Sequence, residues 1–245
     1  GFMAGFTGDE IVRMLEQAGV QSDFIKLEHG ISRINLKLKN IDGTEINGQG
    51  PDIGQQQIDQ LMGKLDQLNT DDVLVLAGSI PKSLPSDIYE KIMQRMEGRE
   101  IMVVVDATKD LLCNVLKYKP FLIKPNHIEL GEIFGRTLAN DDEIRECAQQ
   151  LQQRGARNVL VSMAGDGAIL LDENGEFHKI QAPKGKVKNS VGAGDSMVAG
   201  FLTGYLESKD YGMALKMGTA TGSATAFADG LATREEAMAL LQTLC

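Results

Sequence analysis

The sequence predicts an α/β fold, a three-layer α/β/α sandwich with a mainly parallel central sheet and a small β-hairpin. Short runs that are apolar on both faces alternate along the chain with segments of helical periodicity. Continuous apolar strands are typical of parallel sheets, because helices cover both faces of such sheets. One segment near the N-terminus instead alternates between apolar and polar residues, which predicts the hairpin.

The expected strands and helices follow one another in a regular order. Apolar runs predict strands at 73–76, 101–105, 121–123 and 159–161. Apolar stripes at helical spacing predict helices at 9–15, 58–68, 86–96, 144–151, 196–206 and 211–227. Thr233 and Glu236 form a capping-box pattern before a final helix. Polar residues recur just after each strand, at the sheet edge where ligands bind in open α/β folds.

The hairpin is expected within residues 31–48, with a turn at Asp42-Gly43 and a returning strand at 44–46. Its two faces differ, with Ile34, Leu36 and Leu38 on one and Arg33, Asn35 and Lys37 on the other. The apolar face therefore needs cover from the main core or from another subunit.

Composition excludes several classes of function. The chain has 245 residues, a net charge of −9 and a pI of about 4.9, which disfavours broad binding to nucleic acid or to an anionic membrane surface. The cysteines, Cys113, Cys147 and Cys245, are widely spaced and odd in number, which fits neither a disulfide framework nor a zinc pattern. We therefore expect a cytoplasmic protein with reduced cysteines.

Gly192-Ala193-Gly194-Asp195 is the strongest chemical motif. The glycines allow backbone N–H groups to converge beside the positive end of an apolar helix that is expected to begin near Ser196. Such a pocket suits a phosphoryl oxygen, and Asp195 could accept a hydroxyl proton at its edge. A glycine-rich turn with Asp195 as a helix cap explains the residues equally well.

Two further segments have similar alternatives. In the segment 124–129, Asn126 and Glu129 are three residues apart and could hold Mg²⁺ through waters, although a helix-capping pair is the commoner meaning. The segment 162–167 could wrap a nucleotide, but Asp166-Gly167 is also an ordinary hairpin signal, which is favoured on its own.

Polar residues of the hairpin form a last candidate site. Arg33, Asn35 and Lys37, with Asn47 on the returning strand, could grip a phosphorylated sugar. A solvated strand face is the commoner meaning of this pattern.

The order of these motifs resembles the ribokinase-like (PfkB) family of sugar kinases. Residues 189–201 are similar to the family's C-terminal signature, and residues 124–129 to its magnesium-associated Asn-x-x-Glu motif. The stretches 32–37, 44–51 and 76–81 are most similar to bacterial members that phosphorylate fructose 1-phosphate. The resemblance covers essentially the whole chain.

This resemblance implies one ribokinase-like kinase domain over residues 1–245, with a β lid at 31–48. The implied activity is ATP-dependent phosphorylation of fructose 1-phosphate to fructose 1,6-bisphosphate, with Mg²⁺. Asp195 would be the general base. The implied anion hole is Gly192, Ala193 and Gly194; the nucleotide contacts are Ser162, Gly165, Asp166, Gly167, Lys124 and Ser223; the sugar contacts are Arg33, Asn35, Asn47 and Ser79; and the metal contacts are Asn126 and Glu129.

The resemblance also implies a homodimer through the lid, and it leaves rivals open. A tagatose-6-phosphate kinase or another sugar kinase of the family fits the same motifs, as does a non-catalytic protein that binds a nucleotide or sugar phosphate for regulation. Family members carry an opening segment, with a sugar-binding aspartate and a Gly-Gly-Lys loop, before the point that matches Gly1. A truncated sequence is the expected reason. A dehydrogenase is disfavoured, since no strand–GxGxxG–helix unit is found.

Overall fold

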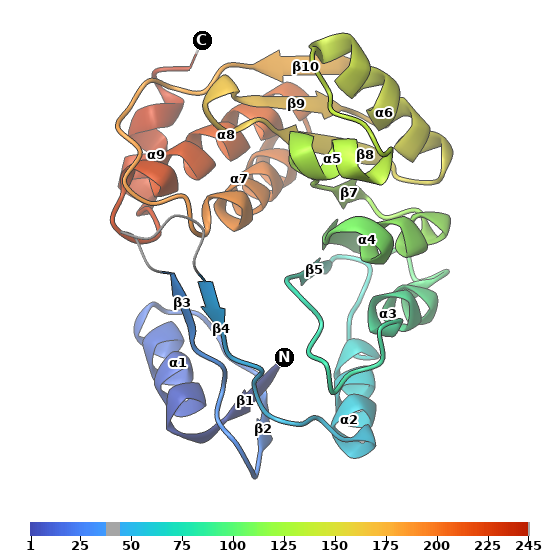
Figure 1. Ribbon diagram of the computed structural model, residues 1–245, viewed down its shortest axis with the longest axis vertical. Helices are drawn as coiled ribbons and strands as arrows, with labels where there is room; N and C mark the ends of the chain where they lie inside the picture. The colour runs from blue at the N-terminus through green and yellow to red at the C-terminus, as the bar shows by residue number, and fades with distance from the viewer. Residues whose placement is uncertain (38–44, 245) are drawn as a thin grey trace. The chain divides into compact units, whose positions relative to one another are not determined.

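The computed structural model describes residues 1–37 and 45–244 (Figure 1). The chain forms two compact units. Unit 1 comprises Gly1–Thr70 and Ser79–Arg99, and unit 2 comprises Asp71–Gly78 and Glu100–Cys245.

Unit 2 contains a six-stranded sheet in the order β10-β9-β8-β7-β6-β5. Its strands are β5 (Val73–Ala77), β6 (Met102–Asp106), β7 (Leu122–Ile123), β8 (Asn158–Ser162), β9 (Ala168–Leu171) and β10 (Phe177–Ile180). Strands β5 to β8 are parallel, whereas β9 and β10 each run antiparallel to their neighbours. The mainly parallel sheet is therefore confirmed.

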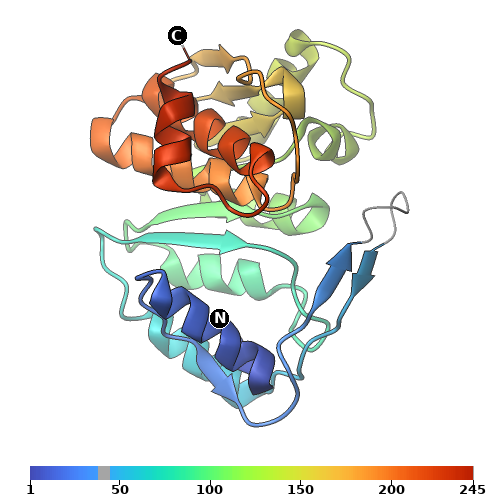
Figure 2. The same ribbon diagram turned by 90° about the vertical axis from the view of Figure 1, so that its left-hand side faces the viewer.

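Helices cover both faces of this sheet. The helices of unit 2 are α4 (Lys109–Val115), α5 (His127–Ile133), α6 (Asp141–Gln153), α7 (Ala193–Ser208), α8 (Tyr211–Phe227) and α9 (Arg234–Leu241), with short 3₁₀ turns at Leu116–Tyr118 and Ala164–Asp166. Helices α7 and α8 lie on one face of the sheet, and α4, α5 and α6 lie on the other (Figure 1). Figure 2 shows α7, α8 and α9 in front of the strands. The three predicted layers are present.

The core of unit 2 lies between the sheet and the pair α7–α8. Leu122, Leu160 and Leu170 of the strands pack in one buried cluster with Phe201 of α7 and Leu215 of α8. Small residues on α7 and α8 allow the two helices to pack closely. A Cβ atom at Gly200 would lie 2.5 Å from Thr221 Oγ1, so α7 and α8 meet at a distance that larger residues would forbid.

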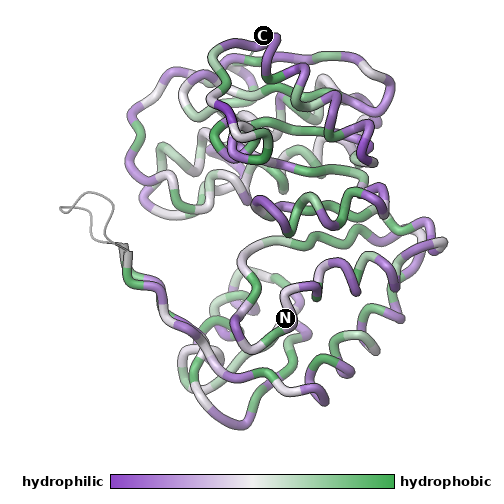
Figure 3. The backbone as a smooth tube through the Cα atoms, turned by 45° about the vertical axis from the view of Figure 1, so that its right-hand side comes forward, coloured by the Kyte–Doolittle hydropathy of each residue, from purple (hydrophilic) through white to green (hydrophobic). Residues whose placement is uncertain are grey.

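Unit 1 contains short strands and amphipathic helices. They are β1 (Phe2–Ala4), α1 (Gly5–Gln17), β2 (Ile25–Leu27), β3 (Asn35–Lys37), β4 (Glu45–Asn47), α2 (Gln55–Leu65) and α3 (Ile88–Met96). Strands β1 and β2 pair in parallel. Figure 3 shows hydrophilic and hydrophobic residues alternating along the helices of this unit. In α3, Ile88, Ile92 and Met96 are buried, as their four-residue spacing predicts.

The predicted hairpin is present as the antiparallel pair β3–β4, in which Leu36 faces Ile46. Its apolar face is open, because Ile34, Leu36 and Ile46 are 61%, 50% and 58% exposed. Leu38 and the turn Asp42-Gly43 lie outside the described residues. Cover of this face by another subunit stays a prediction.

Some details differ from the sequence predictions. Helix α1 begins at Gly5 rather than Asp9, and α7 begins at Ala193 rather than near Ser196. Cys113 and Cys147 are free thiols, as expected, while Cys245 lies outside the described residues. None of the helices in the described part of the chain combines the length and apolar composition that a bilayer-spanning segment requires.

Candidate active site

The start of helix α7 presents backbone donors. Gly192 precedes the helix with a φ of +79°, a conformation that favours glycine. Ala193 N–H donates to Ser190 O at 3.2 Å, but the N–H groups of Gly194 and Asp195 have no recorded acceptor within residues 1–37 and 45–244. Free donors at the positive end of a helix form an anion-binding pocket.

Asp195 lies in the first turn of α7, and its side chain is exposed. In the described structure no side chain caps the N-terminus of α7 through a hydrogen bond. The interpretation of Asp195 as a helix cap is therefore wrong. Its carboxylate is left available to accept a proton beside the free donors of the helix.

Lys124 and Asp106 form a buried ion pair next to this helix start. Lys124 is only 6% exposed, and its Nζ atom lies 3.2 Å from Asp106 Oδ1. A Cβ atom at Gly194 would lie 3.2 Å from the same Nζ, so the ammonium group sits against the first turn of α7. A buried cation therefore adds positive charge to the helix donors.

Two further carboxylates, those of Asp195 and Glu129, lie close enough to Asp106 to act on its charge. Burial raises the pKa of the Asp106 carboxyl above its usual value, and Lys124 opposes that rise. The negative charges of Asp195 and Glu129 raise this pKa further. The carboxylates outnumber the single ammonium group, and carboxylate oxygens are ligands that Mg²⁺ prefers.

Asn126 and Glu129 form the capping box at the start of α5. Asn126 Oδ1 accepts from the N–H groups of Ile128 and Glu129 at 2.9 and 2.8 Å, and Glu129 Oε2 accepts from Asn126 N–H at 2.8 Å. The capping interpretation is thus confirmed. The capping bonds use Asn126 Oδ1 and Glu129 Oε2, and within the described residues Glu129 Oε1 has no hydrogen-bond partner. Glu129 is therefore the residue of this pair that is better placed to contact a metal ion.

A pocket of about 670 Å³ opens at the α7 start within unit 2. It contains eight of the residues that the family resemblance assigns to catalysis, nucleotide or metal, namely Lys124, Asn126, Glu129, Ser162, Gly165, Ala193, Gly194 and Ser223. Gly192, Asp195, Asp166 and Gly167 are not among the lining residues. The volume and the mixture of apolar and polar groups suit a small molecule such as a nucleotide.

Phe227 forms part of an apolar end of this pocket, together with Pro183, Gly185 and Val187. A Cβ atom at Gly185 would lie 2.2 Å from a ring atom of Phe227, so the ring rests directly on the loop backbone. The N–H groups of Lys188 and Asn189 donate to Ala226 O and hold that loop against the end of α8. A planar base would find a flat apolar wall here.

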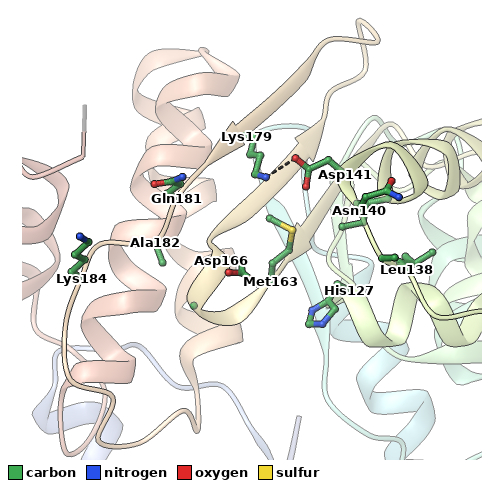
Figure 4. A pocket seen from close by; sticks show the side chains of 13 residues that line it. His127, Leu138, Asn140, Asp141, Met163, Asp166, Lys179, Gln181, Ala182 and Lys184 are labelled. Carbon is green, nitrogen blue, oxygen red and sulfur yellow. Dashed lines mark hydrogen bonds and ion pairs between the residues drawn. The ribbon is translucent and has the colours of Figure 1, made fainter.

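A second pocket of about 530 Å³ adjoins the first, with His127, Gly165, Ala182 and Lys184 common to both. Asp166 lines this second pocket (Figure 4). Lys179 reaches across to Asp141 in an ion pair, which Figure 4 shows as a dashed line. The two pockets therefore form one continuous depression through the residues common to both.

Residues 163–167 form the tight connection between β8 and β9. Met163 N–H donates to Gly167 O at 2.9 Å, and Gly167 has a φ of +93°. A Cβ atom there would lie 2.0 Å from Ile180 O. The hairpin interpretation of Asp166-Gly167 is confirmed, and the glycine is required by the turn whether or not a nucleotide binds.

The sugar-site residues lie together in unit 1. Arg33 Nη2 donates to Ser79 Oγ at 2.9 Å, and Asn35 faces Asn47 across the hairpin. All four side chains are exposed, as the solvated-face alternative also predicts. The side chain of Lys37 lies outside the described residues.

Two parts of this site are not among the residues predicted from the sequence. Asp106 follows the apolar run 101–105, and the signal that could have found it is its carboxylate at the carboxyl edge of a parallel strand. Phe227 and the loop 183–187 carried no signal, because their packing joins segments far apart in the chain.

The fold and site define an α/β protein with an anion-binding helix start, a carboxylate beside it and a nucleotide-sized pocket. A model of the pfkB family carbohydrate kinases matches residues 2–238. The chain belongs to this family.

Two curated relatives are similar over most of the chain. The 1-phosphofructokinase of Bacillus subtilis (strain 168) is 44% identical over 241 residues, which cover 98% of this chain and 79% of that protein. The D-tagatose-1-phosphate kinase of Bacillus licheniformis is 36% identical over 232 residues, which cover 94% of this chain and 76% of that one.

Solved structures confirm the predicted ribokinase-like fold. A crystal structure of a Staphylococcus aureus protein has a TM-score of 0.89 and 39% identity, and the match covers 100% of this chain and 79% of that chain. Ribokinase from Thermotoga maritima has a TM-score of 0.79 at 19% identity, with coverage of 98% and 80%.

Proposed function

We propose that this protein transfers the γ-phosphoryl group of ATP to the C6 hydroxyl of fructose 1-phosphate, giving fructose 1,6-bisphosphate and ADP. The free N–H donors at the start of α7, with Asp195 in the same helical turn, carry this proposal. The similarity to the B. subtilis 1-phosphofructokinase supports fructose 1-phosphate as the acceptor.

In the proposed reaction, the C6 oxygen forms a bond to the γ-phosphorus while the bond from that phosphorus to the leaving oxygen of ADP breaks. Asp195 receives the proton of the C6 hydroxyl. The free N–H groups of Gly194 and Asp195, with the Lys124 ammonium beside them, stabilise the negative charge on the phosphoryl oxygens. The pocket with Ser162, Gly165 and Ser223 holds the rest of the nucleotide.

Mg²⁺ would lie near Glu129, with Asn126 fixing the orientation of that side chain through the capping box. When bound, the ion would offset charge on the phosphate oxygens of ATP.

A second candidate is the same transfer to tagatose 1-phosphate, which the similarity to the B. licheniformis D-tagatose-1-phosphate kinase favours. Both acceptors are ketohexose 1-phosphates, and both present a free C6 hydroxyl. A tagatose-6-phosphate kinase, the sequence alternative, would need the opposite arrangement, with the existing phosphate at C6.

ADP release in a coupled assay distinguishes these candidates. We expect the largest kcat/KM on fructose 1-phosphate, a smaller value on tagatose 1-phosphate, and the smallest on tagatose 6-phosphate. ADP release that is independent of any phosphosugar would contradict the proposal. No ADP release with any phosphosugar would also contradict it and would favour the regulatory alternative.

Arg33→Ala should raise the KM for the sugar 1-phosphate about 10-fold to 100-fold, because a charge-assisted contact to phosphate is worth about 1.5–3 kcal/mol. The KM for ATP should stay within about 2-fold. Arg13→Ala, which removes an exposed arginine of the same unit paired with Glu10, is the matched control and should change neither value. A change in the KM for ATP alone would show that Arg33 does not bind the sugar phosphate.

Gly185→Ala should raise the KM for ATP about 10-fold or more. The new methyl group cannot fit beside Phe227, so the ring or the loop must move into the pocket. Gly63→Ala in α2, where a Cβ atom meets nothing within 4 Å, is the control and should leave the KM unchanged. An unchanged KM for ATP in Gly185→Ala would mean that the base does not lie against Phe227.

Three further features belong to the proposal. Residues 31–48 act as a lid on the sugar site, the exposed face of Ile34, Leu36 and Ile46 joins two copies into a homodimer, and the enzyme works in the cytoplasm on free metabolites. The exposure of those side chains supports the second feature.

A further inference from the structure

The register of the parallel sheet brings Asp106 and Lys124 together. Strands β6 and β7 pair Val104 with Leu122 and Val105 with Ile123, so the next residues of both strands follow side by side at the carboxyl edge. Lys124 N–H still donates to Val105 O at 3.3 Å, which keeps this edge in line. The two side chains leave the sheet toward the start of α7.

Asp106 is the charged partner of the buried Lys124 ammonium group. A buried ammonium group without an opposite charge loses its proton or moves to solvent. Asp106 supplies the charge at 3.2 Å, and it is itself largely buried with a side-chain exposure of 18%. The ion pair with Asp106 therefore fixes the position of the Lys124 ammonium group.

That place is the first turn of α7. Lys124 Nζ lies where a side chain at Gly194 would begin, since a Cβ atom there would be 3.2 Å from Nζ and 3.6 Å from Cε. Lys124 and Gly194 both line the nucleotide-sized pocket. An anion at the helix donors therefore meets this ammonium group directly.

We infer that Asp106 is a positioning residue whose carboxylate holds the Lys124 ammonium against the start of α7, where the ammonium stabilises the phosphoryl group in transfer. Asp106 acts through Lys124 and does not itself touch the substrate. This inference rests on the proposed kinase function.

A double-mutant cycle tests the dependence of Asp106 on Lys124. Asp106→Asn keeps the shape and removes the charge, and Lys124→Met keeps most of the apolar stem. We expect kcat to fall about 10-fold in Asp106→Asn and about 100-fold in Lys124→Met. The double variant should be no slower than Lys124→Met, because Asp106 has nothing left to position.

The KM for the sugar phosphate should stay within about 2-fold of the wild-type value in all variants. A general loss of structure would change this KM as well. Glu146→Gln is the control, since it breaks an exposed ion pair with Arg136 on α6 and should leave kcat unchanged. Asp106→Asn could fail to fold, because Lys124 would then be buried without a partner. In that case the comparison of Lys124→Met with the double variant still tests whether Asp106 acts through Lys124.

The same cycle can be measured as the dissociation constant of ATP by calorimetry, which needs no turnover. If the wild type releases no ADP, the proposed function fails, but the ATP-binding measurement still tests the inference. We expect each single variant to weaken ATP binding about 10-fold and the double variant to weaken it by no more. Effects that multiply in the double variant, or an Asp106→Asn protein with unchanged kcat and ATP affinity, would overturn the inference.

Discussion

Asp195→Asn is expected to lower kcat by about 10²-fold to 10⁴-fold, the usual contribution of a positioned general base. The substitution keeps the size of the side chain and removes its ability to take the C6 proton. The KM for ATP should change little, because Asp195 does not line the nucleotide-sized pocket. Steady-state kinetics with saturating ATP and sugar phosphate measures both quantities.

The control must separate catalysis from helix electrostatics. Asp195 also lies in the first turn of a helix, where any carboxylate stabilises the helix dipole. Asp142→Asn removes a carboxylate from the equivalent turn of α6 and should leave kcat unchanged. Near-normal turnover by Asp195→Asn, or an equal loss in Asp142→Asn, would remove Asp195 from its catalytic role.

Phe201→Ala is expected to lower the free energy of unfolding by about 3–5 kcal/mol. Phe201 is 0% exposed and joins α7 to the strands of unit 2. Its loss leaves a cavity between Leu122, Leu160 and the helix pair. Denaturant unfolding followed by circular dichroism at 222 nm suits this protein, which has no tryptophan.

Leu206→Ala on the same helix is the matched control. Leu206 is 44% exposed, so its truncation removes an apolar side chain from the same helix but should cost much less than that of Phe201. Equal destabilisation by the two substitutions would contradict the placement of the α7 inner face on the sheet. A change in the slope m for Phe201→Ala would instead indicate an altered unfolded or native ensemble.

Sequence patterns were sufficient for the sheet and most helices, because the patterns reflect burial along each element. The runs at 73–76 and 101–105 lie within β5 and β6. The sequence predicts the start of α7 three residues too late, because glycines are poor helix formers and Gly192-Ala193-Gly194 suggests a loop. Gly192 with its positive φ lies just before the helix, and Gly194 lies inside it, next to Lys124 Nζ.

The candidate site could be predicted only in part. Asn126 and Glu129 show why, since the capping box and a magnesium contact use the same residues and the sequence cannot separate them. In the structure the capping bonds occupy Asn126 Oδ1 and Glu129 Oε2. The Asp106–Lys124 pair needed the register of β6 and β7, which no local pattern contains.

The contact between Phe227 and Gly185, which forms the apolar wall of the pocket, also could not be predicted from the sequence. The two residues lie 42 positions apart, and their contact depends on the path of the loop 181–190 over the end of α8. Gly185 therefore looked like any other loop glycine. Only the packed ring shows why a side chain is excluded there.

The central claim is that this protein adds a phosphoryl group from ATP to C6 of a ketohexose 1-phosphate, with Asp195 as the base. Phosphorus NMR of the wild type with ATP, Mg²⁺ and fructose 1-phosphate tests the claim most directly. It should show ADP and a bisphosphate with one phosphorus on C1 and one on C6, and the Asp195→Asn protein should form this product at least about 100-fold more slowly. Inorganic phosphate in place of the bisphosphate, or a second phosphate on another carbon, would contradict the account.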